Sequence, residues 1–387
     1  MLILIENGEI YSPEPQGKAS VLLADSKILK IGKVERASLD KLGVEYEVVD
    51  ANGCCVTPGM IDAHQHLLGG SGENGFSTQT PELSATEIIE GAVTTVVGCL
   101  GVDTTMKTMP GLLGKVKALK EEGLSAYMWT GGYNVPPTTI TGTVRSDIMF
   151  IEEIIGIGEI AIADERSTDP TIHELARLTN DAYVAGMMSK KCGVSHFHVG
   201  DRDERMKLLF ELLDCYKTPP QTIYATHIER SEELMAEAAK LSKRGCFVDI
   251  DTVDEDLAKQ LEIFANKRGD MAKLTVSSDS STTPPATVFE QLRDCVINND
   301  FTLDRVLPLV TSNVAEVLKL ERKGKLEEGC DADILVLEKE SLELLEVISG
   351  GDRLFRDGSL AFKEAFLADS KRKIELEGEK PLKSVAA

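Results

Sequence analysis

Residues 57–70 read TPGMIDAHQHLLGG, an apolar run that begins at a Pro-Gly pair and ends at a Gly-Gly pair. A run bounded in this way is typical of a buried β-strand that opens into a loop. Side chains alternate between the faces of a strand, so His64 and His66 point the same way, close enough to hold one metal ion. Taken alone, the pair fits two hydrogen-bonded barrel histidines equally well.

Similar apolar runs recur along the chain, separated by loops and amphipathic helix patterns. The expected strands are Gly59–Leu67, Thr94–Leu100, Ala126–Tyr133, Glu159–Asp164, Val194–Val199, Tyr224–His227, Cys246–Asp251 and Leu274–Asp279. The expected helices are Ala85–Ala92, Leu112–Glu122, Ile172–Lys190, Glu204–Cys215, Glu232–Arg244, Asp254–Arg268 and Pro285–Asn298. Strands that alternate with helices indicate a parallel sheet, and eight such units predict an α/β fold, a TIM-like (β/α)8 barrel.

Short β-rich runs with turn signals lie on both sides of the barrel pattern. We expect the runs from the two chain ends to pair with each other. Residues 1–57 and 321–387 are therefore expected to form a small, discontinuous β-sandwich domain with a tail from about residue 369, and residues 58–320 to form the barrel.

Composition excludes several classes of function. The net charge of −22, without any basic block, argues against nucleic-acid binding because phosphates would be repelled. No run reaches the roughly 18 apolar residues of a membrane span, and Glu6 interrupts the apolar start of the chain. The eight cysteines form no CxxC pair and indicate reduced, mostly structural thiols. We expect a cytoplasmic protein without membrane or nucleic-acid partners.

The histidines and one aspartate gather at predicted strand ends. His198 and His227 end two later strands, and Asp279 ends the eighth. In an eight-stranded parallel barrel these ends line the same mouth as His64 and His66, where active sites form. Four imidazoles and a carboxylate supply donors for one or two zinc-like ions.

Two further histidines are candidates for the same role. His196 shares the alternation of His198, but it lies deeper in the strand, and we therefore favour His198. His173 opens an amphipathic helix and is expected to serve packing or the surface.

This arrangement resembles the amidohydrolase superfamily and, more narrowly, the isoaspartyl (β-aspartyl) dipeptidases. The narrower resemblance rests on HQHLLGGSGE (64–73), TGGYNVP (130–136), DERS (164–167), HVGD (198–201), THIER (226–230) and SSD (277–279). It implies a binuclear metallohydrolase, a homo-oligomer, that cleaves the β-aspartyl peptide bond of small dipeptides by a metal-bridging hydroxide. Zinc is the expected metal.

The resemblance also implies a ligand set. One metal would be held by His64, His66 and Asp279, and the other by His198 and His227. In the family a carboxylated lysine on the fourth strand usually bridges the metals, but no lysine lies between residues 120 and 190. Glu159 occupies the matching position, and we expect it to bridge two metals. The alternative is that it only caps the strand and that the site holds a single metal.

The remaining site residues are assigned from the substrate that the resemblance implies. Glu73 would bind the ammonium, and Arg166 and Arg230 the carboxylates. Tyr133 would stabilise the oxyanion, and Asp279 would act as general base and then as proton donor to the leaving amine. Further substrate contacts are expected from Ser71 and Thr283.

Two departures from the family pattern concern the substrate. Val102 stands where a threonine is common, and the segment SSTTP (280–284) replaces a glycine-rich loop with a serine, for which Thr283 is the expected substitute. The alternatives are a cyclic-amide hydrolase of the dihydroorotase or hydantoinase kind, an N-acyl amino acid hydrolase, a deaminase, and a non-catalytic relative. A set of four histidines and two carboxylates argues against the last.

Overall fold

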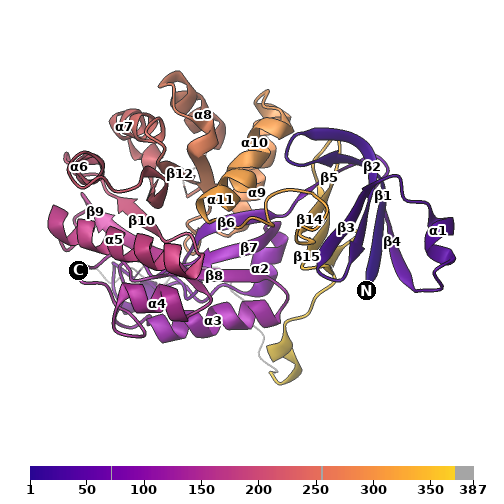
Figure 1. Cartoon of the computed structure of the whole chain (residues 1–387), viewed down its shortest axis with the longest axis horizontal. Helices are drawn as coiled ribbons and strands as arrows, with labels where there is room; N and C mark the ends of the chain where they lie inside the picture. The colour runs from indigo at the N-terminus through magenta and orange to yellow at the C-terminus, as the bar shows by residue number, and fades with distance from the viewer. Residues whose placement is uncertain (71, 254–255, 371–387) are drawn as a thin grey trace, which may run out of the picture.

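The computed structural model describes residues 1–70, 72–253 and 256–370 (Figure 1). Ser71, the expected helix start at Asp254 and most of the expected tail lie outside these ranges. In the part of the chain that is described, each helix is too short or too polar to span a membrane.

Eight parallel strands form the predicted barrel, each paired with the next along the chain. They are β6 (Met60–Gln65), β7 (Val93–Gly98), β8 (Ser125–Thr130), β9 (Ile154–Ile162), β10 (Val194–Val199), β11 (Ile223–Thr226), β12 (Phe247–Asp251) and β13 (Leu274–Ser277). The first and last strands meet where the main-chain N–H of His66 donates to the carbonyl of Ser280 at 2.7 Å. The barrel prediction is thus confirmed.

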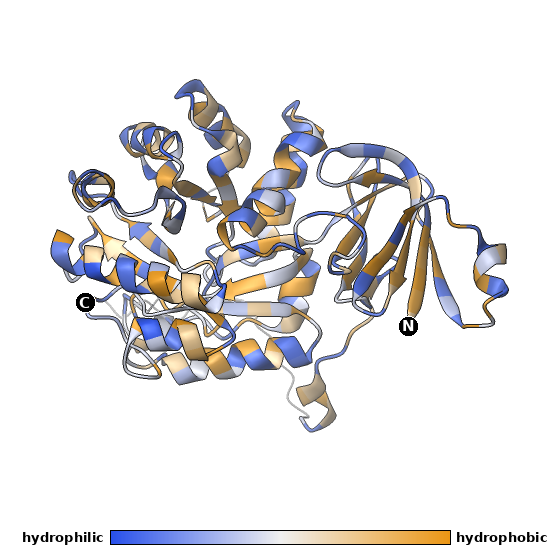
Figure 2. Cartoon of the chain, viewed as in Figure 1, coloured by the Kyte–Doolittle hydropathy of each residue, from blue (hydrophilic) through white to orange (hydrophobic). Residues whose placement is uncertain are grey.

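Helices cover the outside of the barrel strands (Figure 1). They are α2 (Ala85–Glu90), α3 (Met109–Glu121), α4 (Val144–Phe150), α5 (Ile172–Ser189), α6 (Lys207–Cys215), α7 (Glu232–Ser242), α8 (Leu257–Asn266), α9 (Ala286–Asn298), α10 (Leu303–Val310) and α11 (Ser312–Val317). The sequence did not predict α4, α10 or α11. Strands are mostly hydrophobic, whereas the helices also carry hydrophilic stretches (Figure 2), as expected for helices with one face towards a core.

Nine strands from both chain ends form the small β-sandwich domain, which lies beside the barrel (Figure 1). They are β1 (Leu2–Tyr11), β2 (Pro15–Ala24), β3 (Lys27–Gly32), β4 (Tyr46–Asp50), β5 (Cys54–Pro58), β14 (Ile334–Glu338), β15 (Leu344–Ser349), β16 (Asp352–Arg356) and β17 (Ser359–Leu360), with the short helix α1 (Arg36–Asp40). The expected pairing of the two chain ends is found where β5 lies antiparallel to β14. Because β5 ends at Pro58 and β6 begins at Met60, this domain anchors the first barrel strand.

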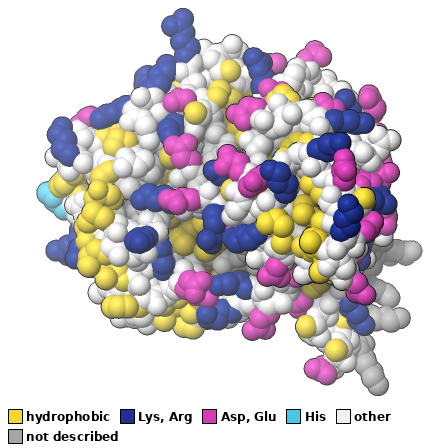
Figure 3. All heavy atoms as spheres, turned by 45° about the vertical axis from the view of Figure 1, so that its right-hand side comes forward, with side chains coloured by type: hydrophobic (Ala, Val, Ile, Leu, Met, Phe, Trp, Pro, Cys, Tyr) yellow, Lys and Arg dark blue, Asp and Glu magenta, His cyan; other side chains and the backbone are white. Residues whose placement is uncertain are grey.

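The surface is mixed in character. Basic, acidic and apolar side chains are interspersed over the face shown in Figure 3. This face offers no continuous basic surface to a phosphate backbone, in agreement with the strongly acidic composition.

Candidate active site

Strand β6 carries His64, and His66 directly follows its last residue at the barrel mouth. The ring centroids of His64 and His66 lie 5.4 Å apart. The buried carboxylate of Asp62 accepts the main-chain N–H of His64 at 3.1 Å and the side-chain amide of Gln65 at 2.9 Å. These hydrogen bonds fix the main chain at the end of the strand, and this holds both imidazoles in place.

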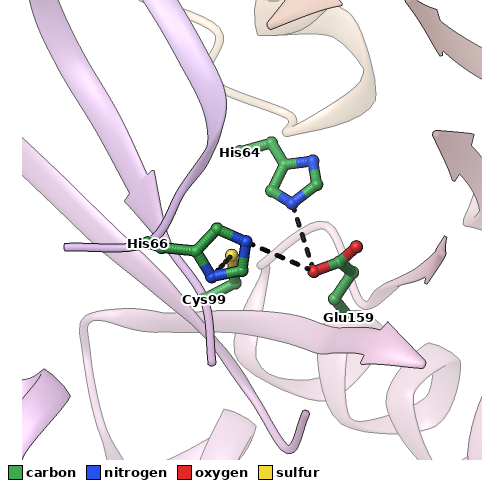
Figure 4. A group of neighbouring side chains, drawn as sticks. All are labelled: His64, His66, Cys99 and Glu159. Atoms are coloured by element: carbon green, nitrogen blue, oxygen red, sulfur yellow. Dashed lines mark hydrogen bonds and ion pairs between the residues drawn. The ribbon is translucent and has the colours of Figure 1, made fainter. Parts of the chain in front are cut away.

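Glu159 on β9 lies between the two histidine pairs. Its Oε2 atom is 3.2 Å from Nε2 of His64 and 3.8 Å from Nε2 of His66. Figure 4 marks both contacts with dashed lines. Its Oε1 atom is 2.8 Å from Nδ1 of His198 and 3.1 Å from Nε2 of His227. One carboxylate oxygen therefore faces each pair, and the side chain is fully buried.

Asp279 contacts both His64 and His66. It follows β13 and adopts a left-handed backbone conformation with φ of 45°. Its Oδ1 atom lies 3.0 Å from Nε2 of His66 and 3.3 Å from Nε2 of His64. Asp279, His64 and His66 thus converge on one point.

This donor set fits a metal centre. Both ring nitrogens of His64 and the Oε2 atom of Glu159 are buried without a hydrogen bond from any described residue. Leaving such groups unsatisfied costs roughly 1–3 kcal/mol each. Burial also raises the pKa of Glu159, but the charge of His64 and the hydrogen bonds of His198 and His227 outweigh burial and hold this pKa well below its usual range. Buried imidazoles around an ionised carboxylate match the donors that divalent metals prefer.

Two carboxylates, Asp164 and Asp251, contact His198 and His227 and orient their rings. Asp251 lies 2.6 Å from Nδ1 of His227, and Asp164 lies 2.9 Å from Nε2 of His198. With an ion bound, the imidazole nitrogen that faces Asp251 or Asp164 would carry the proton, and the other nitrogen would offer its lone pair to the ion. Burial raises the pKa of Asp164, but hydrogen bonds from Arg166 and His198 hold it well below its usual range.

Replacing one of these orienting carboxylates should weaken metal binding. We expect Asp251→Asn to reduce metal affinity by roughly 10- to 100-fold, since His227 loses its charged hydrogen-bond acceptor. Competition with a chromogenic chelator measures this affinity directly. A lower melting temperature with unchanged metal affinity would contradict the orienting role of Asp251.

A cavity of about 220 Å³ opens above the cluster. Its wall includes His66, Glu73, Val102, Asp103, Lys107, Tyr133, Arg166, His198, Arg230, Asp279, Ser281 and Thr282. The expected metal ligands His66, His198 and Asp279 therefore face the same space as the two expected arginines.

The charged residues of this cavity contact one another. Arg166 donates through Nε and Nη2 to the two oxygens of Asp164, both at 2.9 Å, and through Nη1 to Glu73 at 3.2 Å. Arg230 donates to the carbonyl of Val199 at 3.2 Å. Both guanidinium groups are held by the protein while they line the cavity.

Tyr133 brings a phenol to the same wall. Its hydroxyl lies 2.7 Å from Nδ1 of His198, and its side chain is almost fully buried. Burial, followed by the charge of Glu159, raises the pKa of Tyr133 well above its usual value. The phenol stays protonated at neutral pH and can donate a hydrogen bond.

Thr283, an expected substrate contact, does not line the cavity. Ser71 lies outside the described residues, and the wall carries Ser281 and Thr282 in place of Thr283. His196 stacks on Trp129 with ring centroids 5.6 Å apart and lies edge-on to His64 at 4.9 Å, and it does not line the cavity. His198 lines the cavity, and its preference over His196 as a ligand stays a prediction.

Sequence reasoning assigned no role to four residues of the site. They are Asp164, Asp251, Cys99 and Lys107. The Sγ atom of Cys99 lies 3.6 Å from Nδ1 of His66 (Figure 4). The alternation that singled out His64 and His66 applies equally to the predicted strand Cys246–Asp251, whose last residue faces the mouth, and could have identified Asp251.

The chain forms an eight-stranded parallel barrel, and four histidines and two carboxylates gather at its mouth. This combination is typical of metal-dependent hydrolases with a barrel fold. Residues 55–360 match the sequence model of the amidohydrolase family. The chain belongs to this family, whose members use divalent metals.

The chain is also similar to individual proteins. A crystal structure of β-aspartyl dipeptidase from Fervidobacterium islandicum AW-1 shares 37% identity and a TM-score of 0.89, over 97% of this chain and 100% of that one. A structure of that enzyme in complex with the β-Asp-Leu dipeptide shares 35% identity and a TM-score of 0.88, over 97% of this chain and 99% of that one. The dihydroorotase of Lactobacillus johnsonii is 25% identical over 88% of this chain and 90% of that protein. The dihydroorotase of Clostridioides difficile is 33% identical over 25% of this chain, and the match spans only 21% of that protein.

Proposed function

We propose that this protein is a β-aspartyl dipeptidase, which hydrolyses the amide bond between the side-chain carboxyl of aspartate and a following residue. One observation carries the proposal: Glu73, Arg166 and Arg230 line the same cavity as His66, His198 and Asp279. The similarity along nearly the whole chain to a β-aspartyl dipeptidase supports it.

The charges of the cavity match those of a β-aspartyl dipeptide, which has one ammonium and two carboxylates. Glu73 and Arg166 already form an ion pair at 3.2 Å. We propose that the substrate breaks this ion pair. Its ammonium then binds Glu73, and one of its carboxylates binds Arg166. Arg230 binds a carboxylate as well. A planar guanidinium suits this exchange because it can offer two parallel N–H donors.

We propose that the site holds two divalent ions, with zinc as the candidate. His64, His66 and Asp279 would bind one ion, His198 and His227 the other, and Glu159 would bind both. Such ions, when bound, lower the pKa of a water molecule and polarise a carbonyl group. Because glutamate carries its own carboxylate, bicarbonate is not needed to assemble the site.

Two residues supply the proton and hydrogen-bond chemistry of the proposed reaction. Tyr133 donates its phenolic hydrogen bond to the scissile carbonyl oxygen as negative charge develops there. Asp279 takes a proton from the attacking water and passes it to the leaving amine. The raised pKa of Tyr133 keeps its proton on the hydroxyl throughout.

A cyclic-amide hydrolase is the second candidate because the barrel and the ligand set would serve it too. Opening a hydantoin ring, however, requires no group that binds a free ammonium. Glu73 beside Arg166 and Arg230 therefore favours the dipeptide.

The deciding experiment compares β-Asp-Leu with α-Asp-Leu at equal concentration, using zinc-loaded protein. We expect cleavage of the β-linked peptide alone, since only in that linkage do the ammonium and a free carboxylate share one carbon atom, which lies one methylene group away from the scissile carbonyl. Hydantoin and N-acetyl-leucine serve as controls for the alternatives. A metal-replete protein that cleaves neither dipeptide would contradict the proposed function.

A further inference from the structure

Lys107, in the loop between β7 and α3, forms part of the wall of the substrate cavity. Its Nζ atom is buried, and none of the described residues forms a hydrogen bond with it. Other enclosed lysines differ: the half-buried Lys191 donates to three main-chain carbonyls, and the buried Lys323 pairs with Asp333. Because a buried ammonium without a partner is costly, Lys107 needs an anion that the described residues do not supply.

The two carboxylates whose charges act on Lys107 have other partners. Asp103 accepts two main-chain N–H groups of its own loop and the side-chain amide of Gln79. Glu82 lies 3.5 Å from the ammonium of Lys115. Burial lowers the pKa of Lys107 by more than the charges of Asp103 and Glu82 raise it. A carboxylate that enters the cavity would supply the missing partner.

Lys107 lies on the side of the cavity that the loops after β6 and β7 form. A Cβ atom at Gly69 would lie 3.0 Å from Nζ of Lys107, so the ammonium packs against the loop after β6. Glu73 belongs to that same loop, and it lines a hollow of about 390 Å³ together with Val102 of the loop after β7. The residue proposed to bind the ammonium of the substrate is therefore on the same side as Lys107.

The two arginines of the cavity are grouped around His198. Nη2 of Arg166 lies 3.2 Å from Nε2 of His198, and Nη1 of Arg230 lies 3.3 Å from the same atom. Arg166 follows β9 and Arg230 follows β11. Strand β11 is four strands away from β7 in the eight-stranded barrel, and Arg230 therefore comes from the side opposite to Lys107.

We propose that Lys107 binds the aspartyl α-carboxylate of the substrate, while Arg166 and Arg230 bind the carboxylate of the leaving residue. The inference rests on the proposed function. In a β-aspartyl dipeptide the two carboxylates lie on opposite sides of the scissile amide, and only the aspartyl carboxylate shares a carbon atom with the ammonium. With the ammonium on Glu73, the aspartyl carboxylate lies towards Lys107 and the other carboxylate towards the arginines. Lys107 thereby selects substrates that carry a free aspartyl α-carboxylate.

The test compares kcat/KM of the wild type and Lys107→Met, both loaded with zinc, for three peptides. β-Ala-Leu lacks only the aspartyl carboxylate of β-Asp-Leu, and β-Asp-leucinamide lacks only the charge of the leaving carboxylate. We expect Lys107→Met to lower kcat/KM for β-Asp-Leu and β-Asp-leucinamide by roughly 10- to 100-fold, the scale of a hydrogen bond to a charged group. For β-Ala-Leu the loss should stay within about twofold. Metal content and melting temperature should not fall, because the Lys107 ammonium has no hydrogen bond from a described residue to lose.

Lys115→Met is the matched control, because Lys115 is also half-buried but pairs with Glu82 and does not line the cavity. It should keep the wild-type kcat/KM for all three peptides. If Lys107→Met does not fold, Lys107→Gln is the second neutral variant and should give the same pattern of losses.

An equal loss for β-Asp-Leu and β-Ala-Leu, or no loss for either, would overturn the inference while wild-type cleavage of β-Asp-Leu upholds the proposed function. A loss that disappears with β-Asp-leucinamide would also overturn it, because Lys107 would then bind the leaving residue. Cleavage of none of the three peptides by metal-replete wild-type protein would overturn both the inference and the proposed function.

Discussion

Glu159→Gln is expected to lose bound metal and turnover together. Glu159 places one oxygen against His64 and His66 and the other against His198 and His227. Glutamine has nearly the same shape, but its amide is neutral, and the NH2 group that replaces one oxygen has no lone pair to offer an ion. Since this carboxylate would touch both metals, we expect turnover to fall by more than the roughly 100-fold cost of removing an outer partner.

The measurement pairs metal content, from plasma emission spectroscopy of dialysed protein, with turnover of β-Asp-Leu. Glu153→Gln is a matched control because Glu153 is also a buried carboxylate and lies just before β9, where Lys117 and Lys120 pair with it. The control should cost stability without loss of metal. Added bicarbonate should restore neither property in Glu159→Gln. A variant that keeps two metals and near-normal turnover would refute the bridging role.

The barrel strands could be predicted because their apolar runs carry the signal themselves. The prediction for Val194–Val199 agrees with β10 at both ends. Strand β9 begins at Ile154, five residues before the predicted start, because Gly156 and Gly158 weaken the β pattern there. A Cβ atom at position 156 would lie only 2.7 Å from the ring of Trp129, so close packing requires glycine. Sequence propensity alone cannot reveal that contact.

The helices that escaped prediction are short or interrupted. Helix α4 has seven residues, too few to repeat an apolar spacing twice. Helix α10 contains Pro308, which is usually a sign of a helix end. Both helices are stabilised by packing on the barrel rather than by their own pattern.

The candidate site was partly predictable for a related reason. Strand alternation and strand ends single out His64, His66 and Asp279 without any knowledge of three-dimensional contacts. The position of Glu159 between two histidine pairs, and the contacts of Asp164 with His198, depend on how separate strands meet. Such contacts join residues 34 or more positions apart and leave no local pattern.

Tyr133→Phe is expected to lower kcat by roughly 100- to 1000-fold, or about 2.7 to 4 kcal/mol of transition-state stabilisation. Tyr133 lies three residues beyond β8, and its main chain is anchored on both sides. Its N–H donates to the carbonyl of Gly101, and its own carbonyl accepts from Ala161, both at 3.3 Å. Removing the hydroxyl should therefore leave the ring in place and delete only the donor.

The two kinetic constants separate catalysis from binding. The Michaelis constant for β-Asp-Leu should change little, since the hydrogen bond strengthens only as charge develops on the carbonyl oxygen. Metal content should match the wild type, and Tyr127→Phe, six residues earlier on β8, should keep full activity. Because the pKa of Tyr133 lies well above its usual value, wild-type kcat should show no loss from phenol ionisation up to about pH 10. A Tyr133→Phe effect confined to the Michaelis constant would assign the hydroxyl to substrate binding, and the oxyanion would then depend on the metals alone.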